Sequence, residues 1–294
     1  MSGLLLIIIS SVIYPFIDVV KKKATKVYRI KIIFWGITVF SVPFYFFITL
    51  WQGIPEIQPS FWWIIAVNTP LLVLTNIMLI KDEKIAPLST TLPLLSLTPV
   101  FLIFTSYFFL GELPNAYGII GIFLVVLGAL LLKGEDLRKG LRYRIKDIFS
   151  HRSSVYILII AFIWSFSANF AKMGIQASSV WFFLSVTVFL EAIIMSVWMG
   201  VKHRHHFKNV IQGHLWYLVL GAILSVAADV MFLSGLETTF VSYAIAIKRA
   251  LLIVGSIVLG TYYFKEKNIK YRIGGALVMA IGMAFILVFG RLAA

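Results

Sequence analysis

Lys248 and Arg249 are adjacent cations inside an apolar run, residues 240–264, that is long enough to cross a bilayer. At about 1.5 Å of rise per helical residue, Lys248 lies about 12 Å from the start of the run. The hydrocarbon core of a bilayer is about 30 Å thick. A cation at the centre of a spanning helix costs about 2.5–3.5 kcal/mol, whereas each Leu, Ile or Val stabilises it by only about 0.3–0.6 kcal/mol. The pair therefore needs a partner.

Two interpretations of that partner follow from the residue types. An arginine can bind a phosphate or carboxylate through two parallel hydrogen bonds, and a lysine adds a point charge, so the pair can hold the anionic group of a transported solute. Alternatively, the cations form a structural ion pair with a carboxylate on another span. Polar side chains recur every seven residues along the run, at Ser242, Arg249, Ser256 and Tyr263. This spacing predicts one polar helix face that lines a cavity.

Two carboxylates also lie inside apolar runs, Glu191 in residues 181–200 and Asp229 in residues 215–235. By the same helical rise, Asp229 lies about 10 Å below the outer end, close to the depth of Lys248. Paired with the two cations, the carboxylates make a neutral site that takes a zwitterion; pointing elsewhere, they leave a cationic site for anions. A carboxyl that gains and loses a proton would couple transport to a proton gradient. A packing or hydrogen-bonding role is the remaining interpretation of each.

Other polar residues in the apolar runs are candidates for lining the same cavity: Tyr14, Asn76, Trp164, Asn169 and Ser242. The alternative for the amides is adhesion between helices, since amides hydrogen-bond across helices in lipid. Asp18 is expected to neutralise Lys21 and Lys22 at the inner end of the first run.

Composition assigns the chain to the polytopic membrane proteins. Hydrophobic residues make up 61% and charged residues 13% of its 294 residues, and mean hydropathy is +0.97. The formal net charge of +14 lies in short loops, as membrane orientation requires, so no nucleic-acid partner is expected. The absence of cysteine excludes disulfides, thiolate metal sites and cysteine nucleophiles. We find no phosphate-binding glycine loop, catalytic triad or ATP-binding domain, and we expect neither an enzyme nor a cofactor. The segment KHRHH at 202–206 is interpreted as a surface for lipid headgroups, not a metal site.

The apolar runs predict an all-α integral membrane protein with ten transmembrane helices. They fall near residues 3–20, 30–50, 62–80, 87–110, 116–132, 155–174, 181–200, 215–235, 239–264 and 272–290. The charged segment 134–152 divides five runs from five and predicts a cytoplasmic linker between a first repeat, 1–133, and a second, 153–294.

Lysine and arginine are concentrated in the loops after the odd-numbered runs, for example at Arg138, Lys139, Arg142 and Arg144. The alternate loops and both ends hold few, namely Lys172 and Arg291. The positive-inside rule then places the basic loops in the cytoplasm and both termini on the outer side of the cell membrane.

The two halves also resemble each other. A shift of 154 residues places Gly121 on Gly275 and Gly128 on Gly282, and it also aligns Glu112 with Glu266. A repeat of five spans is odd in number, so its second copy enters the membrane in the opposite sense. Inverted repeats with a site near the midplane are the architecture of secondary transporters.

The first spans of the halves, IYPFIDVVKKKA and IWSFSANFAKMGI, and the last junctions, YFFLGELPNAYGIIGIFLVVLGALLL and YYFKEKNIKYRIGGALVMAIGMAFIL, resemble the two EamA-type repeats of the drug/metabolite transporter superfamily. Within that superfamily, Lys248 and Arg249 are similar to a lysine–arginine pair of the plastid phosphate translocators and nucleotide-sugar transporters, which holds the substrate phosphate. The fourth run lacks the further lysine that those translocators use.

We therefore expect a secondary transporter of a small organic anion, phosphorylated as the resemblance implies, working by alternating access around a central site. One alternative is an exporter of neutral or zwitterionic metabolites such as amino acids. Another is a membrane protein that flips or binds a phosphate-bearing lipid. Because no ATP-binding domain is present, the energy is expected to come from a proton gradient, a counter-substrate or a partner subunit.

Overall fold

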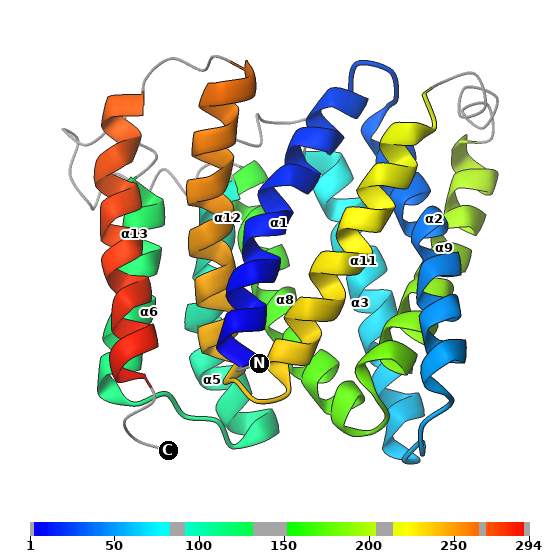
Figure 1. The fold of residues 1–294 in the computed structure, drawn as a ribbon, viewed down its shortest axis with the longest axis horizontal. Helices are drawn as coiled ribbons and strands as arrows, with labels where there is room; N and C mark the ends of the chain where they lie inside the picture. Colours follow the sequence, from blue (N-terminus) through cyan, green and yellow to red (C-terminus); the bar gives the residue numbers. More distant parts are fainter. Residues whose placement is uncertain (1–2, 83–91, 132–151, 204–213, 265–268, 291–294) are drawn as a thin grey trace. The chain divides into compact units, whose positions relative to one another are not determined.

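The computed structural model describes residues 3–82, 92–131, 152–203, 214–264 and 269–290 (Figure 1). Its helices are α1 (Gly3–Ala24), α2 (Ile30–Gln52), α3 (Ser60–Asp82), the 3₁₀ helix η1 (Leu92–Leu97), α5 (Thr98–Leu110), α6 (Ala116–Leu131), α8 (Arg152–Gln176), α9 (Val180–His203), α11 (Trp216–Leu236), α12 (Val241–Phe264) and α13 (Ile269–Phe289). Within these ranges ten α-helices coincide with the ten predicted runs, so the predicted all-α fold is confirmed. The predicted linker 134–152 lies outside the described residues except for Arg152, which begins α8.

Helix length and composition agree with a membrane-spanning chain. Among the described residues, 7 helices are long and apolar enough to cross a bilayer, and three shorter apolar stretches lie in η1–α5, α6 and α13. The fourth run is divided at Thr98, where Pro99 occupies the first turn of α5 and its missing N–H leaves no helical hydrogen bond unmade. The helix ends at Gly111, whose φ of +69° is the left-handed conformation of a glycine C-cap.

Contacts divide the chain into two compact units. Unit 1 comprises Met1–Asn76 and Phe170–Thr238, and unit 2 comprises Ile77–Asn169 and Thr239–Ala294. Each unit therefore combines helices from both halves of the sequence, and α3 and α8 each contribute residues to both units.

In unit 1, α1 packs along α11, and α2 packs on both α9 and α11. Gly235 of α11 allows the close approach of α1, because a Cβ there would lie 2.5 Å from the carbonyl oxygen of Gly3. Small residues at such contacts let helix backbones approach each other in lipid. A buried apolar cluster that includes Tyr28, Ile33 and Leu218 holds α2 against α9 and α11.

In unit 2, α6 and α13 lie side by side and meet at glycines (Figure 1). A Cβ on Gly121 would lie 2.8 Å from the carbonyl oxygen of Gly282, and a Cβ on Gly128 would lie 2.6 Å from that of Gly275. Gly121 and Gly275 are equivalent in the repeat, as are Gly128 and Gly282, so each contact joins one pair member to a member of the other pair. Such reciprocal contacts between antiparallel helices are what a two-fold axis produces. The predicted inverted repeat is therefore confirmed.

The first turn of α12, the helix that carries Lys248 and Arg249, is fixed to the α5–α6 corner of unit 2. Glu112 is 9% exposed, and its Oε2 accepts a hydrogen bond of 2.8 Å from the backbone N–H of Val241. The Asn115 backbone N–H donates to the hydroxyl of Tyr243 at 3.3 Å. The N-terminal backbone groups of a helix lack intrahelical acceptors, and a carboxylate there also suits the helix dipole.

Candidate functional site

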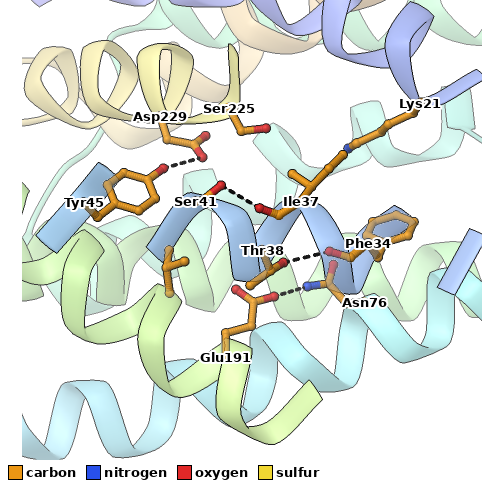
Figure 2. A pocket seen from close by; sticks show the side chains of 11 residues that line it. Lys21, Phe34, Ile37, Thr38, Ser41, Tyr45, Asn76, Glu191, Ser225 and Asp229 are labelled. Atoms are coloured by element: carbon orange, nitrogen blue, oxygen red, sulfur yellow. Dashed lines mark hydrogen bonds between the residues drawn. The ribbon is translucent and has the colours of Figure 1, made fainter. Parts of the chain in front are cut away.

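A cavity of about 180 Å³ lies within unit 1, and residues from five helices line it (Figure 2). Its polar lining includes Lys21, Tyr45, Asn76, Glu191, Ser225 and Asp229. The structure thus brings together three of the predicted site residues: Asn76, Glu191 and Asp229. The fourth, Tyr14, reaches the same group through Asp229.

Asp229 accepts two hydrogen bonds from tyrosine hydroxyls, one on each carboxylate oxygen. Tyr14 donates to Oδ1 at 2.7 Å, and Tyr45 donates to Oδ2 at 3.2 Å. Tyr45 is 1% exposed, so its hydroxyl is held in place by packing as well as by this bond. The helices α1, α2 and α11 therefore converge on one carboxylate.

Glu191 is held by a single amide. Asn76 of α3 donates from Nδ2 to Glu191 Oε1, which joins α3 to α9 (Figure 2). The figure shows the Glu191 carboxylate directed into the same cavity as Thr38 and Ser41 of α2. The cavity can therefore accept solutes or protons at oxygen atoms, with two acidic groups that come from different helices.

Two members of this cavity were missed by the sequence prediction. Lys21 was expected to pair with Asp18, but its ammonium lies 5.2 Å from the centroid of the Phe34 ring, and Asp18 is exposed. Tyr45 carried a usable signal: it follows Ser41 by four residues in an otherwise apolar helix, which places both on one face.

In unit 2, Arg249 stacks on Trp164. The guanidinium carbon lies 4.8 Å from the ring centroid, within the range of a cation–π interaction. Trp164 in turn packs against a buried apolar cluster that includes Leu94, Ile157 and Ile160, which fixes the ring. Both Lys248 and Arg249 are partly buried. The stacking uses the face of the guanidinium, and its N–H donors lie in the plane parallel to the ring.

The remaining predicted residues of unit 2 are buried. Asn169 is 0% exposed: its Oδ1 accepts from the Ser106 hydroxyl at 2.8 Å, and its Nδ2 donates to the Ser165 carbonyl at 2.9 Å. This is the helix adhesion that the sequence left open as an alternative, here between α5 and α8. Ser242 is also 0% exposed, whereas Tyr263 on the same predicted face is 46% exposed. The seven-residue face of α12 is therefore not uniformly open to a cavity.

No metal centre is found among the described residues, where no group of three or more His, Cys, Asp or Glu could hold an ion. The side chains of 202–206, which the sequence assigned to a lipid-facing surface, lie outside that part of the chain.

Two comparisons relate the chain to known proteins. The model of the EamA-like transporter family matches residues 1–133 and 151–288. A solved structure, titled only "Crystal structure of protein", superposes with a TM-score of 0.70 at 13% sequence identity and covers 98% of each chain. At that identity the likeness concerns the fold. No curated protein sequence matches the chain significantly.

Proposed function

Because the chain belongs to the EamA-like transporter family, and so is a multi-pass membrane transporter of small molecules, we propose that its cargo is a small organic anion of the phosphorylated class. The two inverted repeats, which we assign to 1–133 and 153–294, alternate access to a central site. Lys248 and Arg249 of α12 bind the anionic group of the cargo.

The observation that carries this proposal is the stacking of Arg249 on Trp164. A guanidinium fixed by its face keeps its edge donors in one plane, and two parallel donors match the oxygens of a phosphate or carboxylate. Lys248 follows directly in the chain and adds a second positive charge, which favours a phosphate over a single carboxylate. A fixed ring also reduces the side-chain entropy that arginine loses when it binds.

A thermal-shift titration of the purified full chain tests the proposal. The probes are inorganic phosphate, 3-phosphoglycerate, alanine and a short-chain phosphatidic acid, each in the presence of the same detergent. A ligand at 100 times its Kd stabilises the folded protein by about 2.7 kcal/mol. We expect a phosphorylated solute to stabilise the wild type and to lose that effect in Lys248→Ala and Arg249→Ala. Lys22→Ala, which removes an exposed cation at the end of α1, is the control and retains it.

Arg249→Lys tests the geometry, because it keeps the charge but removes the planar fork and most of the stacking. We expect it to weaken binding of the phosphorylated solute at least tenfold. Stabilisation that both alanine variants preserve would refute the anion site. Stabilisation by alanine alone would favour the zwitterion exporter, and stabilisation by phosphatidic acid alone would favour a lipid-handling protein.

The orientation follows from the loop charges. We propose that both termini lie on the outer side of the cell membrane and that the basic loops are cytoplasmic. A reporter fused after Ala294 is expected to be active only when it folds outside the cytoplasm. Activity of a cytoplasm-specific reporter at that position would reverse the assignment.

A further inference from the structure

The acidic cavity of unit 1 contains more negative charge than its own cation balances. Glu191 and Asp229 carry two negative formal charges, and Lys21 carries one positive charge. In the part of the chain that the structure describes, the hydrogen bonds of the carboxylates come from the neutral donors Asn76, Tyr14 and Tyr45. The Lys21 ammonium lies against the Phe34 ring. The cavity is therefore one positive charge short of neutrality, and a partly dehydrated charge in a membrane protein is expensive.

The two carboxylates are not equivalent. Hydroxyl donors occupy both oxygens of Asp229, an arrangement that suits the ionised form. Glu191 has one donor, Asn76, at Oε1. Its Oε2 is therefore the carboxylate oxygen in this cavity at which a proton can be added without displacing a donor. Addition there leaves the Asn76 hydrogen bond in place.

A second observation points to the same place on α9. The Thr187 hydroxyl is 4% exposed and has no hydrogen-bond partner within the described residues. Thr187 precedes Glu191 by four residues, so both lie on one face of the helix. A buried hydroxyl without a partner costs about 1–3 kcal/mol, and it is usually explained by a group that is bound in another state.

We propose that Glu191 is a proton-binding site that couples transport to proton movement, with Asp229 as its permanently charged neighbour. A proton from water in the cavity binds Glu191 Oε2, the carboxylate becomes a carboxylic acid, and the formal charge of the cavity lining changes from −1 to 0. No other bond is made or broken. The neutral cavity can then close away from water at lower cost than the charged one. This inference rests on the proposed transport function.

The groups around Glu191 come from each helix that lines the cavity. They are Lys21 of α1, Tyr45 of α2 and Asp229 of α11, together with the neutral Asn76 of α3. Tyr14 of α1 acts through Asp229. Among these, Asp229 is the near negative charge, and protonation of Glu191 relieves its repulsion.

Infrared difference spectroscopy of the full chain in lipid tests the inference without any cargo. Spectra are recorded while the pH is stepped between about pH 5 and pH 8, where physiological proton gradients act. We expect the C=O stretch of a protonated carboxyl to disappear as the pH rises in the wild type. The band should be absent in Glu191→Gln and present in Asp229→Asn and in the exposed control Asp18→Asn.

A second variant keeps the test decisive if Glu191→Gln does not fold. Asn76→Ala leaves Glu191 in place and removes the donor to its carboxylate, so the loss of the band should move to higher pH by about one unit. Absence of the band in the wild type, its persistence in Glu191→Gln, or an unchanged midpoint in Asn76→Ala would each refute the proposal. Stabilisation by sodium over choline with no carboxyl band would also refute it, in favour of a metal cation.

The outcome is separable from that of the anion site. Arg249→Ala should keep the carboxyl band, because Arg249 belongs to unit 2 and the titrating group to unit 1. A protein that shows the band but no phosphate-dependent stabilisation would retain the proton site and lose the anion site. The reverse result would do the opposite.

Discussion

Replacing Gly282 by alanine tests the glycine contact between α6 and α13, on which the inverted repeat was recognised in three dimensions. A Cβ at Gly282 would lie 2.7 Å from the carbonyl oxygen of Gly121 and 2.7 Å from the backbone nitrogen of Val125. Both neighbours are backbone atoms, which cannot move out of the way by changing rotamer. Since non-bonded atoms prefer about 3.5 Å or more, the helices must separate by roughly 0.5–1 Å.

The free-energy change has two parts of opposite sign. Alanine favours a helix over glycine by about 0.5–1 kcal/mol, and overpacking a tight contact costs about 1–3 kcal/mol. Gly274→Ala on the same helix provides a matched control, because Gly274 is exposed and its Cβ would meet nothing within 4 Å. The helix term is common to the two variants, so their difference isolates the clash, about 1–3 kcal/mol.

The assay is thermal unfolding of both variants in one detergent. Gly274→Ala should unfold at or above the wild-type temperature, and Gly282→Ala on the order of 2–9 °C below Gly274→Ala. Adding Gly121→Ala to Gly282→Ala should cost less than the sum of the single effects, because the first substitution already separates the helices. Equal unfolding temperatures for Gly282→Ala and Gly274→Ala would refute the close contact and, with it, the reciprocal glycine pairing.

Two further predictions concern carboxylates near helix ends. Glu112→Ala removes the acceptor of the Val241 N–H and should destabilise the protein by about 1–2 kcal/mol, whereas Glu112→Gln keeps an acceptor oxygen and should lose less; equal unfolding temperatures of the two variants would contradict the capping role. Partial burial after α11 raises the pKa of Glu237 above its model value of 4.5, so its contribution to stability is full below the pKa of the unfolded chain and is lost as the pH rises through the higher folded value. Glu237→Gln should remove that decline from a plot of unfolding temperature against pH, and an unchanged profile would exclude Glu237 as its source.

The sequence predicted the helices well because the bilayer restricts the alternatives. A backbone in hydrocarbon must satisfy its own hydrogen bonds, so each apolar run of sufficient length becomes a helix. The runs near 30–50 and 116–132 correspond closely to α2 and α6. The matched glycines also carried three-dimensional information, because a glycine in a spanning helix often marks a close helix contact. The pair Gly121 and Gly275 is one instance.

The site residues were harder to predict, because helical periodicity gives the face of a side chain but not the helix that the face meets. Asn169 and Asn76 are both amides in apolar helices, yet one is enclosed by Ser106 and Ser165 and the other holds Glu191 in a cavity. Nothing in their local sequence separates these two environments.

The sequence by itself determined that this chain is a ten-helix membrane protein made of two related halves, because run length, loop charge and repeat spacing are properties of the chain. Only the tertiary structure decided that Tyr14 and Tyr45 meet at Asp229 and that Lys21 enters the same cavity. The physical reason is that spanning helices are apolar on nearly every side. Their partners are chosen by shape and by a few hydrogen bonds, which form between residues far apart in the sequence.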